Sequence, residues 1–307
     1  MNDVPPGWDY NPAAWSQRIP IVVLAAVGFL LAAYLALYQY RVVEDVWEPF
    51  FGRGSEIILN SPTSHLFPVS DAALGAFGYL LDAATGLIGG RNRWRTMPWM
   101  VVLFGVLIGP LGAVSLALVV IQPVVYEAWC TICLATAVIS TLMIGPALDE
   151  VLASLQHLKR ARREGRSVWR VFWGTEQVAP KPQIQNPKTS AATLGAAAQV
   201  VACALGIWLM AAPDVLGYRG AARINDLVIG PVAASIACVA IWEVARPLRW
   251  MNLVLGGWMA IAPAVLGFGG REAANAVLSG LVLCGLSLIG GRRTRRFDGR
   301  WKMLVGS

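Results

Sequence analysis

Two cysteines separated by two residues, Cys130 and Cys133, are the strongest candidates for chemistry in this sequence. They follow Trp129 and open an apolar run that continues to about Ile144. Thiols at positions i and i+3 of a helix lie on one face, close enough to form a disulfide or to exchange with one. The first turn of a helix stabilises negative charge, so we expect Cys130 to be the more acidic and more reactive thiol.

Two other interpretations of this pair stay open. A Cys-x-x-Cys motif often supplies half of a zinc site, but zinc needs a second pair of ligands. The only histidines in the chain are His65 and His157, so we predict no metal site. The other interpretation is that the two cysteines are only small apolar residues that lie close together by chance.

Composition indicates that the cysteines belong to a membrane protein. The 307-residue chain is 56% hydrophobic and 14% charged, whereas about 25% of residues are charged in a soluble domain. The net charge of +7 comes mostly from loop arginines, which report orientation in a bilayer and not nucleic-acid binding. We expect no cleavable signal peptide, because residues 1–17 are polar, rich in Pro and Trp, and precede a full-length apolar run.

Apolar runs predict an all-α integral membrane protein with about eight transmembrane helices, because each is long enough, or nearly so, to cross about 30 Å of hydrocarbon. The runs lie near residues 19–40, 71–90, 98–121, 128–147, 192–212, 224–245, 250–268 and 273–290. Basic residues gather after every second run, in segments 91–95, 159–170, 246–249 and 292–302. The positive-inside rule then places both termini in the cytoplasm of a bacterial inner membrane. Cys130 and Cys133 would lie at the outer face, where disulfides persist.

The runs also predict a division of the chain into five segments. We expect a cytoplasmic tail at 1–17, a four-helix bundle at 18–148, a cytoplasmic helix and Pro-rich linker at 149–190, a repeat module at 191–291, and a basic cytoplasmic tail at 292–307. Three further cysteines, Cys203, Cys238 and Cys284, lie singly inside apolar runs and are expected to pack as small hydrophobic residues.

The repeat module contains two copies of one pattern at an offset of 50 residues. The matching segments are Gly206-x-Trp208 with Gly256-x-Trp258, Ala212-Pro213-x-Val215-Leu216-Gly217 with Ala262-Pro263-x-Val265-Leu266-Gly267, and Asn225 with Asn275. Each copy predicts a helical hairpin with a Pro-Gly turn and a Trp in its first helix. The pattern resembles the SPW repeat of bacterial membrane proteins. Nothing in it suggests a nucleophile, a metal set or a phosphate loop, so we expect an architectural or docking role.

The first half resembles the vitamin K epoxide reductase family over roughly residues 15–150. The motifs that carry the resemblance are Ser61 in the outer loop, Pro68 through Leu74-Gly75-x-x-Gly78-Tyr79, and Trp129-Cys130-x-x-Cys133-Leu134. The resemblance implies that a membrane quinone, of the ubiquinone or menaquinone type, binds as a substrate in the bundle. It also implies that Cys133 faces the quinone, while Cys130 exchanges disulfides with loop cysteines that relay electrons from a thioredoxin-like extracytoplasmic partner.

The sequence departs from the family pattern in the outer loop, which contains no cysteine. Ser55 aligns with the family's second loop cysteine, and the first has no counterpart near residues 49–53. A hydroxyl cannot exchange disulfides, so the internal relay is missing. Either Cys130 meets a partner's disulfide directly, or the chain has kept the bundle and lost the full reaction.

The quinone contacts implied by the resemblance are altered as well. The family's asparagine before the second run aligns with Asp71, which could still contact a quinone oxygen. A tyrosine found beyond the cysteine pair in some members aligns with Ala137, which offers no hydrogen bond. Thr136 or Ser140 could substitute, although hydroxyls in membrane helices often bond to their own backbone.

Three other polar residues have both a functional and a structural interpretation. Asp82 lies within the second run and would either conduct protons or pair with Arg91 or Arg93. His65 lies in the outer loop, where it would stabilise a thiolate or simply be exposed to solvent. Ser61 would contact the substrate or order the loop.

Taken together, the sequence predicts a thiol–disulfide oxidoreductase that passes electrons from an extracytoplasmic thiol partner through Cys130 and Cys133 to a membrane quinone. The expected surroundings are the lipid bilayer, the quinone and a thioredoxin-like protein. A competing hypothesis is a non-enzymatic scaffold or assembly factor with a degenerate reductase-like bundle. Transport has no support, since we find no cluster of intramembrane charges.

Overall fold

The computed structural model describes residues 4–6, 8, 10–66, 68–176 and 192–290, and these form helices and turns without a strand. The eight long helices are α1 (Trp15–Gln39), α3 (Asp71–Leu87), α5 (Pro98–Val125), α6 (Thr131–Arg163), α8 (Ala192–Leu216), α9 (Ala221–Ala240), α10 (Arg249–Leu266) and α11 (Gly270–Leu288). The short ones are α2 (Gly54–Leu59), η1 (Pro62–His65), α4 (Arg93–Thr96), α7 (Val168–Phe172) and η2 (Arg246–Leu248). The predicted all-α class is confirmed, and each predicted apolar run coincides with one long helix.

Five of these helices are long and apolar enough to cross a bilayer: α1, α5, α6, the part of α8 from Leu194 to Leu216, and α9. The protein is therefore a multi-pass membrane protein. Helix α3 has 17 residues, and neither α10 nor α11 is among these five. The predicted number of eight spans therefore stays a prediction.

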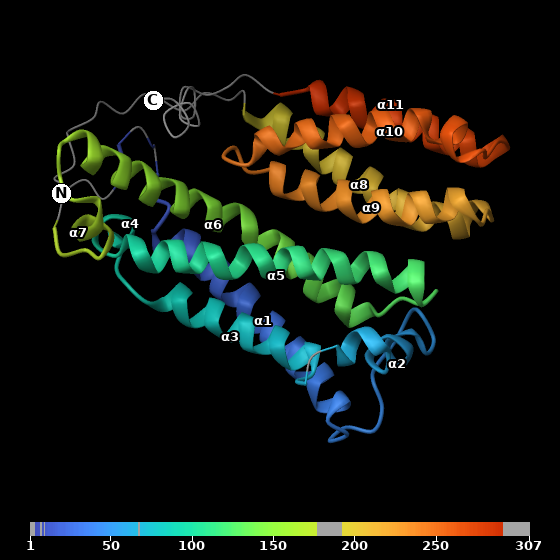
Figure 1. The fold of residues 1–307 in the computed structure, drawn as a ribbon, viewed down its shortest axis with the longest axis horizontal. Helices are drawn as coiled ribbons and strands as arrows, with labels where there is room; N and C mark the ends of the chain where they lie inside the picture. Colours follow the sequence, from blue (N-terminus) through green and yellow to red (C-terminus); the bar gives the residue numbers. More distant parts are fainter. Residues whose placement is uncertain (1–3, 7, 9, 67, 177–191, 291–307) are drawn as a thin grey trace.

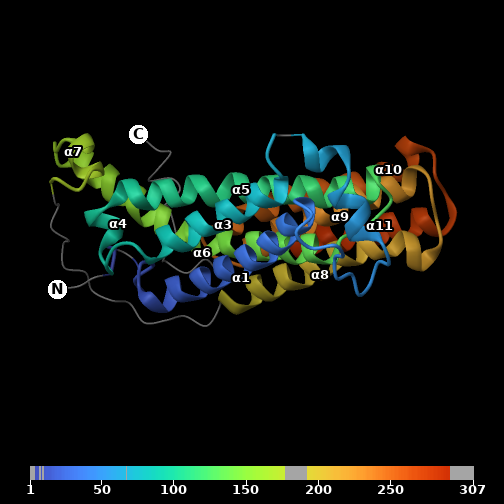
Figure 2. The ribbon, with the colours of Figure 1, turned by 90° about the horizontal axis from the view of Figure 1, so that it is seen from below.

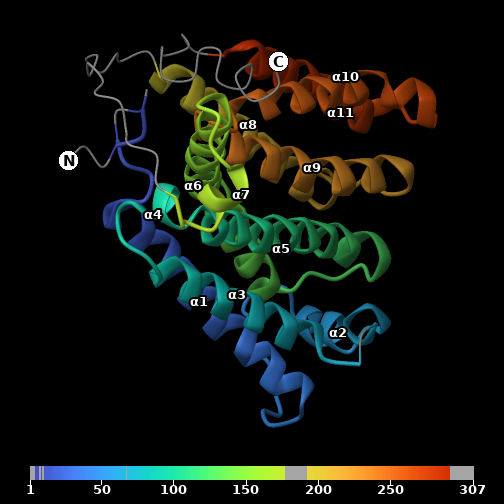
Figure 3. The same ribbon diagram turned by 60° about the vertical axis from the view of Figure 1, so that its left-hand side comes forward.

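The helices form two bundles that lie side by side (Figures 1 and 3). Helices α1, α3, α5 and α6 make the first bundle, whose core includes Ile21, Tyr79, Phe104 and Met143. Helices α8 to α11 make the second bundle, and its helix α9 packs against α5 and α6. The contact between the two bundles is close, because a Cβ atom at Gly145 of α6 would fall 2.2 Å from the indole ring of Trp242.

Helix α6 is one continuous element of 33 residues, or about 50 Å at 1.5 Å per residue. The domain boundary predicted between residues 148 and 149 therefore falls inside this helix. The last turns of α6 are covered by the residues that precede α1: Trp8 donates to Gln156 over 2.9 Å, and Tyr10 donates to Asp149 over 2.5 Å. The described part of the predicted N-terminal tail is thus packed against the bundle.

The two ends of the first bundle differ in charge. Figures 1 and 2 place α4 and α7, with their arginines, at the end opposite to α2 and the start of α6. Val244, beside η2, packs with Trp94 of α4 in one cluster, so the basic turn between α9 and α10 lies at the same end. Three predicted basic segments therefore share one end, and the fourth, 292–302, lies outside the described residues.

The two predicted hairpins are present as α8–α9 and α10–α11, and each turns through a glycine with positive φ, at Gly217 and Gly267. Within each hairpin the helices cross with their backbones in contact. A Cβ atom at Gly206 would fall 2.7 Å from the carbonyl oxygen of Gly230. In the second copy, a Cβ atom at Gly256 would fall 2.7 Å from the carbonyl oxygen of Gly280.

Candidate redox site

Cys130 and Cys133 form a disulfide at the start of α6. Cys130 is the residue that caps the helix, and its Sγ accepts a hydrogen bond from the backbone N–H of Cys133 over 3.1 Å. Its own backbone N–H donates to the side chain of Gln122 over 3.0 Å. Because the backbone N–H groups of the first helical turn lie next to Cys130, they favour a negative charge on its sulfur.

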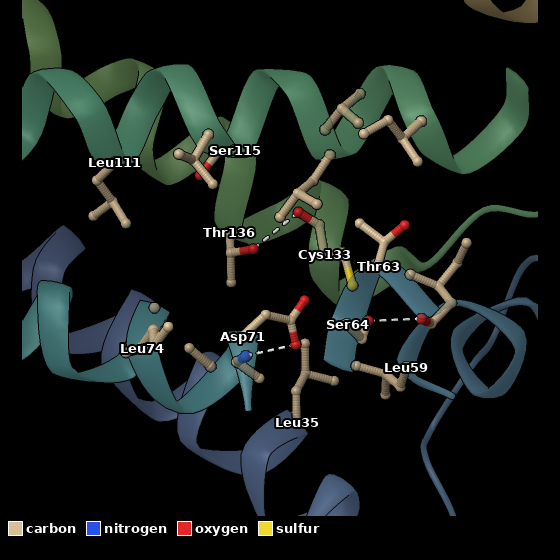
Figure 4. A pocket seen from close by; sticks show the side chains of 18 of the residues that line it. Leu35, Leu59, Thr63, Ser64, Asp71, Leu74, Leu111, Ser115, Cys133 and Thr136 are labelled. Atoms are coloured by element: carbon tan, nitrogen blue, oxygen red, sulfur yellow. Dashed lines mark hydrogen bonds between the residues drawn. The ribbon is translucent and has the colours of Figure 1, made fainter. Parts of the chain in front are cut away.

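A cavity of about 370 Å³ lies between α1, α3, α5, α6 and the outer loop, and Cys133 forms part of its wall (Figure 4). This volume falls within the range of small-molecule sites. The wall is mostly aliphatic, and it includes Leu35, Leu59, Leu74, Leu107, Leu111, Leu118 and Val119. Its polar residues are Ser61, Thr63, Ser64, Asp71, Tyr79, Ser115, Gln122, Tyr126 and Thr136.

Asp71, the residue predicted to contact a quinone oxygen, lies in the cavity wall at the start of α3. Gln39 at the end of α1 donates to its Oδ1 over 2.8 Å. Ser70 caps α3 and donates to the same Gln39 side chain. Gln39 thereby fixes the Asp71 carboxylate, a role that the sequence did not reveal because the two residues are 32 positions apart.

The two predicted hydroxyl contacts are placed differently. Thr136 lies in the cavity wall, but its hydroxyl donates to the carbonyl of Cys133 in its own helix over 2.9 Å. Ser140 is not part of the wall, and its hydroxyl is 2.6 Å from the phenol of Tyr79. Tyr79 does line the cavity and donates to the carbonyl of Thr136 over 2.7 Å. Tyr79 and Ser115 are therefore wall residues that sequence reasoning did not single out as contacts.

The outer loop brings Ser55 next to the cysteine pair. Ser55 is fully buried in α2 and donates to the carboxylate of Glu48. The same carboxylate accepts a hydrogen bond over 2.9 Å from the backbone N–H of Thr131, the residue that follows Cys130. Ser55 and the residue after Cys130 thus bond to one carboxylate, while the alignment of Ser55 with a loop cysteine stays a prediction.

Of the remaining predicted residues, only Ser61 lies in the cavity wall, where it is buried. His65 is exposed at the end of η1 and does not line the cavity. Asp82 is fully buried outside the cavity, and neither carboxylate oxygen has a hydrogen-bond partner among the described residues. Arg93, one of its expected partners, pairs with Glu150 instead.

The other cysteines and possible metal ligands lie apart from this site. Helices α8 and α9 bring the side chains of Cys203 and Cys238 into contact, which the sequence did not reveal. Cys284 is directed at the carbonyl of Leu253, 3.5 Å away. Within the part of the chain that the structure describes, no group of three or more His, Cys, Asp or Glu residues is arranged to hold a metal ion.

Two known protein families match this chain, one in each bundle. Residues 19–147 match the model of the vitamin K epoxide reductase family. This match runs through the four helices of the first bundle, and we name that bundle the vitamin K epoxide reductase domain after the family that it matches. Residues 196–290 match the SPW repeat domain, which covers both hairpins of the second bundle. Neither the curated proteins nor the solved structures contain a significant match to the chain.

The vitamin K epoxide reductase domain contains the disulfide and every residue that lines the cavity. The family that this half of the chain matches is associated with quinone-linked disulfide chemistry in membranes. The SPW repeat domain supplies none of the wall residues and packs against the outside of α5 and α6. Both family resemblances predicted from the sequence are confirmed, in the predicted order along the chain.

Proposed function

We propose that this chain is a quinone-linked thiol–disulfide oxidoreductase of a bacterial cytoplasmic membrane. The observation that carries the proposal is the position of Cys133, which joins a disulfide to the wall of a largely apolar cavity. A quinone ring, of the ubiquinone or menaquinone type, fits such a cavity because it is flat, apolar and in need of only one or two polar contacts. Both termini would lie in the cytoplasm and the disulfide at the outer face.

The first half of the reaction oxidises an extracytoplasmic dithiol, of the kind that a thioredoxin-like protein presents. A partner thiolate attacks the Sγ of Cys130, the bond between Cys130 and Cys133 breaks, and Cys133 leaves as a thiolate. The partner's second thiolate then attacks the partner's own sulfur in the mixed disulfide and releases Cys130. The partner ends as a disulfide, and the pair ends as a dithiol that has gained two electrons and two protons.

The second half returns those electrons to the membrane. The quinone takes up two electrons and two protons from the dithiol and becomes a quinol, while the bond between Cys130 and Cys133 forms again. Cys133 is the residue that delivers them, because its side chain lies in the wall. Asp71, held by Gln39, and the hydroxyls of Thr63 and Tyr126 are the polar groups available to orient the quinone oxygen. No proton from Asp82 is needed for this balance.

The absence of loop cysteines requires the partner to reach Cys130 itself, because Ser55 cannot exchange disulfides. Cys130 has no exposed surface in this structure. This burial is also the observation that favours the second candidate function, a scaffold in which the bundle persists without its reaction. The two candidates differ in a measurable way, since only the oxidoreductase forms a covalent bond to a dithiol protein.

The test uses the full-length protein in lipid nanodiscs with ubiquinone-1 and dithiothreitol as probes. Quinol formation, followed by ultraviolet absorbance, should fall to the protein-free rate in Cys130→Ser and in Cys133→Ser. The Cys284→Ser variant serves as the matched control and should keep the parent rate, because Cys284 lies outside the cavity. Parent rates in both active-site variants would refute the proposal.

A trapping experiment separates the enzyme from the scaffold. In the Cys133→Ser variant the free Cys130 thiolate should attack a thioredoxin-like protein whose single remaining active-site cysteine is a mixed disulfide with thionitrobenzoate; thionitrobenzoate leaves as a thiolate, and the partner stays bonded to Cys130 because no second cysteine can release it. Peptide mass spectrometry identifies the bonded cysteine. The scaffold hypothesis predicts no adduct at Cys130 under the same conditions.

A further inference from the structure

Glu48, in the loop between α1 and α2, accepts more hydrogen bonds than any other carboxylate near the disulfide. Its donors are the backbone N–H groups of Phe50, Phe51 and Thr131 and the hydroxyls of Ser55 and Thr131. These donors come from three separate parts of the chain: the loop itself, α2 and the first residue of α6. A single carboxylate thus connects the outer loop to the helix that carries the cysteines.

The loop and α2 cover the cysteine pair closely. A Cβ atom at Gly54 would fall 2.0 Å from the carbonyl oxygen of Trp129, and the ring of Phe51 lies 6.4 Å from the Trp129 ring. Val46 and Ile58 pack in one cluster with Cys130. As a result Cys130 has no exposed surface, and a soluble thiol such as dithiothreitol reaches it only when the loop moves away.

The charge of Glu48 also bears on the chemistry of Cys130. Burial raises the pKa of this carboxyl, but the hydrogen bonds from Ser55, Thr131 and Phe50 outweigh burial and lower it to about 2. The group is therefore a carboxylate at every physiological pH. It binds the N–H of Thr131, in the first turn that would otherwise stabilise a Cys130 thiolate, and two adjacent negative charges oppose each other.

We propose that Glu48 is a positioning residue that clamps the outer loop over Cys130 and opposes formation of the Cys130 thiolate, so that Cys130 reacts only when the loop lifts from α6. The proposal deepens the oxidoreductase function and rests on it for its biological meaning. A partner that competes for the Glu48 carboxylate would then open the site and activate its thiol at once. In the absence of a partner the loop would open only transiently, so the pair would react slowly with small extracytoplasmic thiols when it is oxidised and with small oxidants when it is reduced.

Other charged and titratable groups surround the cluster, and they define the controls. At the end of α1, on the loop, on α2 and on the segment before α6 these groups are Tyr34, Tyr38, Tyr40, Arg41, Glu44, Asp45, Arg53, Glu56, Tyr126 and Glu127. Arg53 and Glu56 form an ion pair with each other, with Arg53 largely exposed. Among the carboxylates of the described residues, Glu48 is the one that hydrogen-bonds to the first residue of α6.

The experiment measures the alkylation rate of Cys130 by iodoacetamide against pH in the full-length Cys133→Ser protein. Peptide mass spectrometry resolves Cys130 from the three cysteines of the second bundle. The midpoint of the profile reports the pKa of Cys130, and the plateau at high pH reports its accessibility. In Glu48→Gln we expect the midpoint to fall by about one pH unit or more, because a like charge is removed. We also expect the plateau to rise several-fold, because the clamp is weakened.

Two further variants separate the effect of the negative charge at residue 48 from the effect of its side-chain length. Glu48→Asp keeps the charge but is too short to bond both Ser55 and Thr131, so the plateau should rise while the midpoint stays close to the parent value. Glu44→Gln removes an exposed charge from the same loop and should change neither quantity. An unchanged midpoint in Glu48→Gln, or an unchanged plateau in both Glu48 variants, overturns the proposal.

This readout is independent of the oxidoreductase function. Alkylation requires neither quinone nor partner, so a protein that fails to reduce quinone can still show the expected profile. If quinone reduction succeeds and the profile of Glu48→Gln equals that of the parent, only the role of Glu48 is refuted. Circular dichroism of each variant checks that the helices have formed.

Discussion

The two bundles use their polar side chains in opposite ways. In the vitamin K epoxide reductase domain, polar groups such as Asp71 and Tyr126 line a cavity. In the SPW repeat domain, the corresponding groups bond to one another. Trp208 donates to Asn275 of the other copy over 2.9 Å, and Trp258 donates to Asn225 over 2.9 Å.

Backbone packing shows the same contrast. The helices of each SPW hairpin touch at glycines, and Asp226, buried at the hairpin turns, is bonded by Tyr218, Asn225 and Asn275. The first bundle instead keeps a cavity beside its disulfide. Because the Trp of each repeat copy donates its hydrogen bond to the Asn of the other copy, one copy alone would leave these polar groups without their partners. The SPW domain is built to hold its shape, whereas the first domain is built to admit a ligand.

The largest expected effect concerns a new thiol at the reductase site. In a Ser55→Cys, Cys133→Ser double variant, we expect a disulfide between residue 55 and Cys130 in most molecules, because both positions lie beside Thr131 and Glu48. Non-reducing peptide mapping measures the yield. A Thr63→Cys, Cys133→Ser protein is the control, since Thr63 is directed at Tyr126 and should give no crosslink to Cys130. Equal yields from both variants would refute the placement of Ser55.

A second prediction tests whether the SPW domain depends on backbone contact. Gly256→Leu should destabilise the protein by about 3 kcal/mol, because even a Cβ atom there would fall 2.7 Å from Cys284 Sγ and from the Gly280 carbonyl. The adjacent Gly257→Leu is a matched control, since a Cβ atom at Gly257 has no neighbour within 4 Å. Thermal unfolding in detergent measures the difference. Equal melting temperatures for the two variants would remove the contrast between the bundles.

A third and smaller effect is expected at the polar link between the two repeat copies. Asn275→Ala removes a partner from Trp208, Tyr218 and Asp226, and we expect a loss of about 1–2 kcal/mol. Dithiothreitol-dependent quinol formation should stay at the parent rate, because Asn275 lies outside the cavity. A variant with unchanged stability, or with lost quinol formation at full stability, would contradict the division of labour between the domains.

Sequence reasoning reached the helices and the order of the two domains because apolar runs and the 50-residue repeat are local patterns. It also placed Cys133, Asp71 and Ser61, which the structure brings to one cavity. It did not reveal the link of Gln39 to Asp71 or of Glu48 to Thr131. These pairs are 32 and 83 residues apart, and each depends on which helix ends meet in three dimensions.

The continuity of α6 was missed for a different reason. Asp149 and Glu150 end the apolar run and suggest an aqueous boundary, yet both carboxylates are buried, bonded by Tyr10 and Arg93. These two acidic residues therefore mark the point where α6 begins to bond to the residues before α1 and to α4. They do not mark the end of the helix. No local pattern distinguishes these two cases, because the partners come from before α1 and from α4.

The smallest expected effect is an acid-dependent opening of the reductase site. The pKa of Glu48 in the folded protein is about 2, below its ordinary value of 4.5. A carboxyl whose pKa is lowered by folding stabilises the closed loop fully above pH 4.5, and this contribution is lost as the pH falls toward 2. Relative to the Glu48→Gln, Cys133→Ser protein at the same pH, which cancels the titration of the thiol and of the reagent, the reaction of Cys130 with 4,4′-dithiodipyridine in the Cys133→Ser protein should therefore keep a constant ratio from pH 7 to 5 and accelerate below pH 4.5. The acceleration should be modest, because solvent screens a partly exposed carboxylate.

Glu48→Gln should react faster at neutral pH and show no acceleration in acid. Circular dichroism measures helix content and excludes global unfolding. An acid response of equal size in Glu48→Gln would assign the opening to another group and would leave the outer loop of the reductase domain as static as the SPW hairpins beside it.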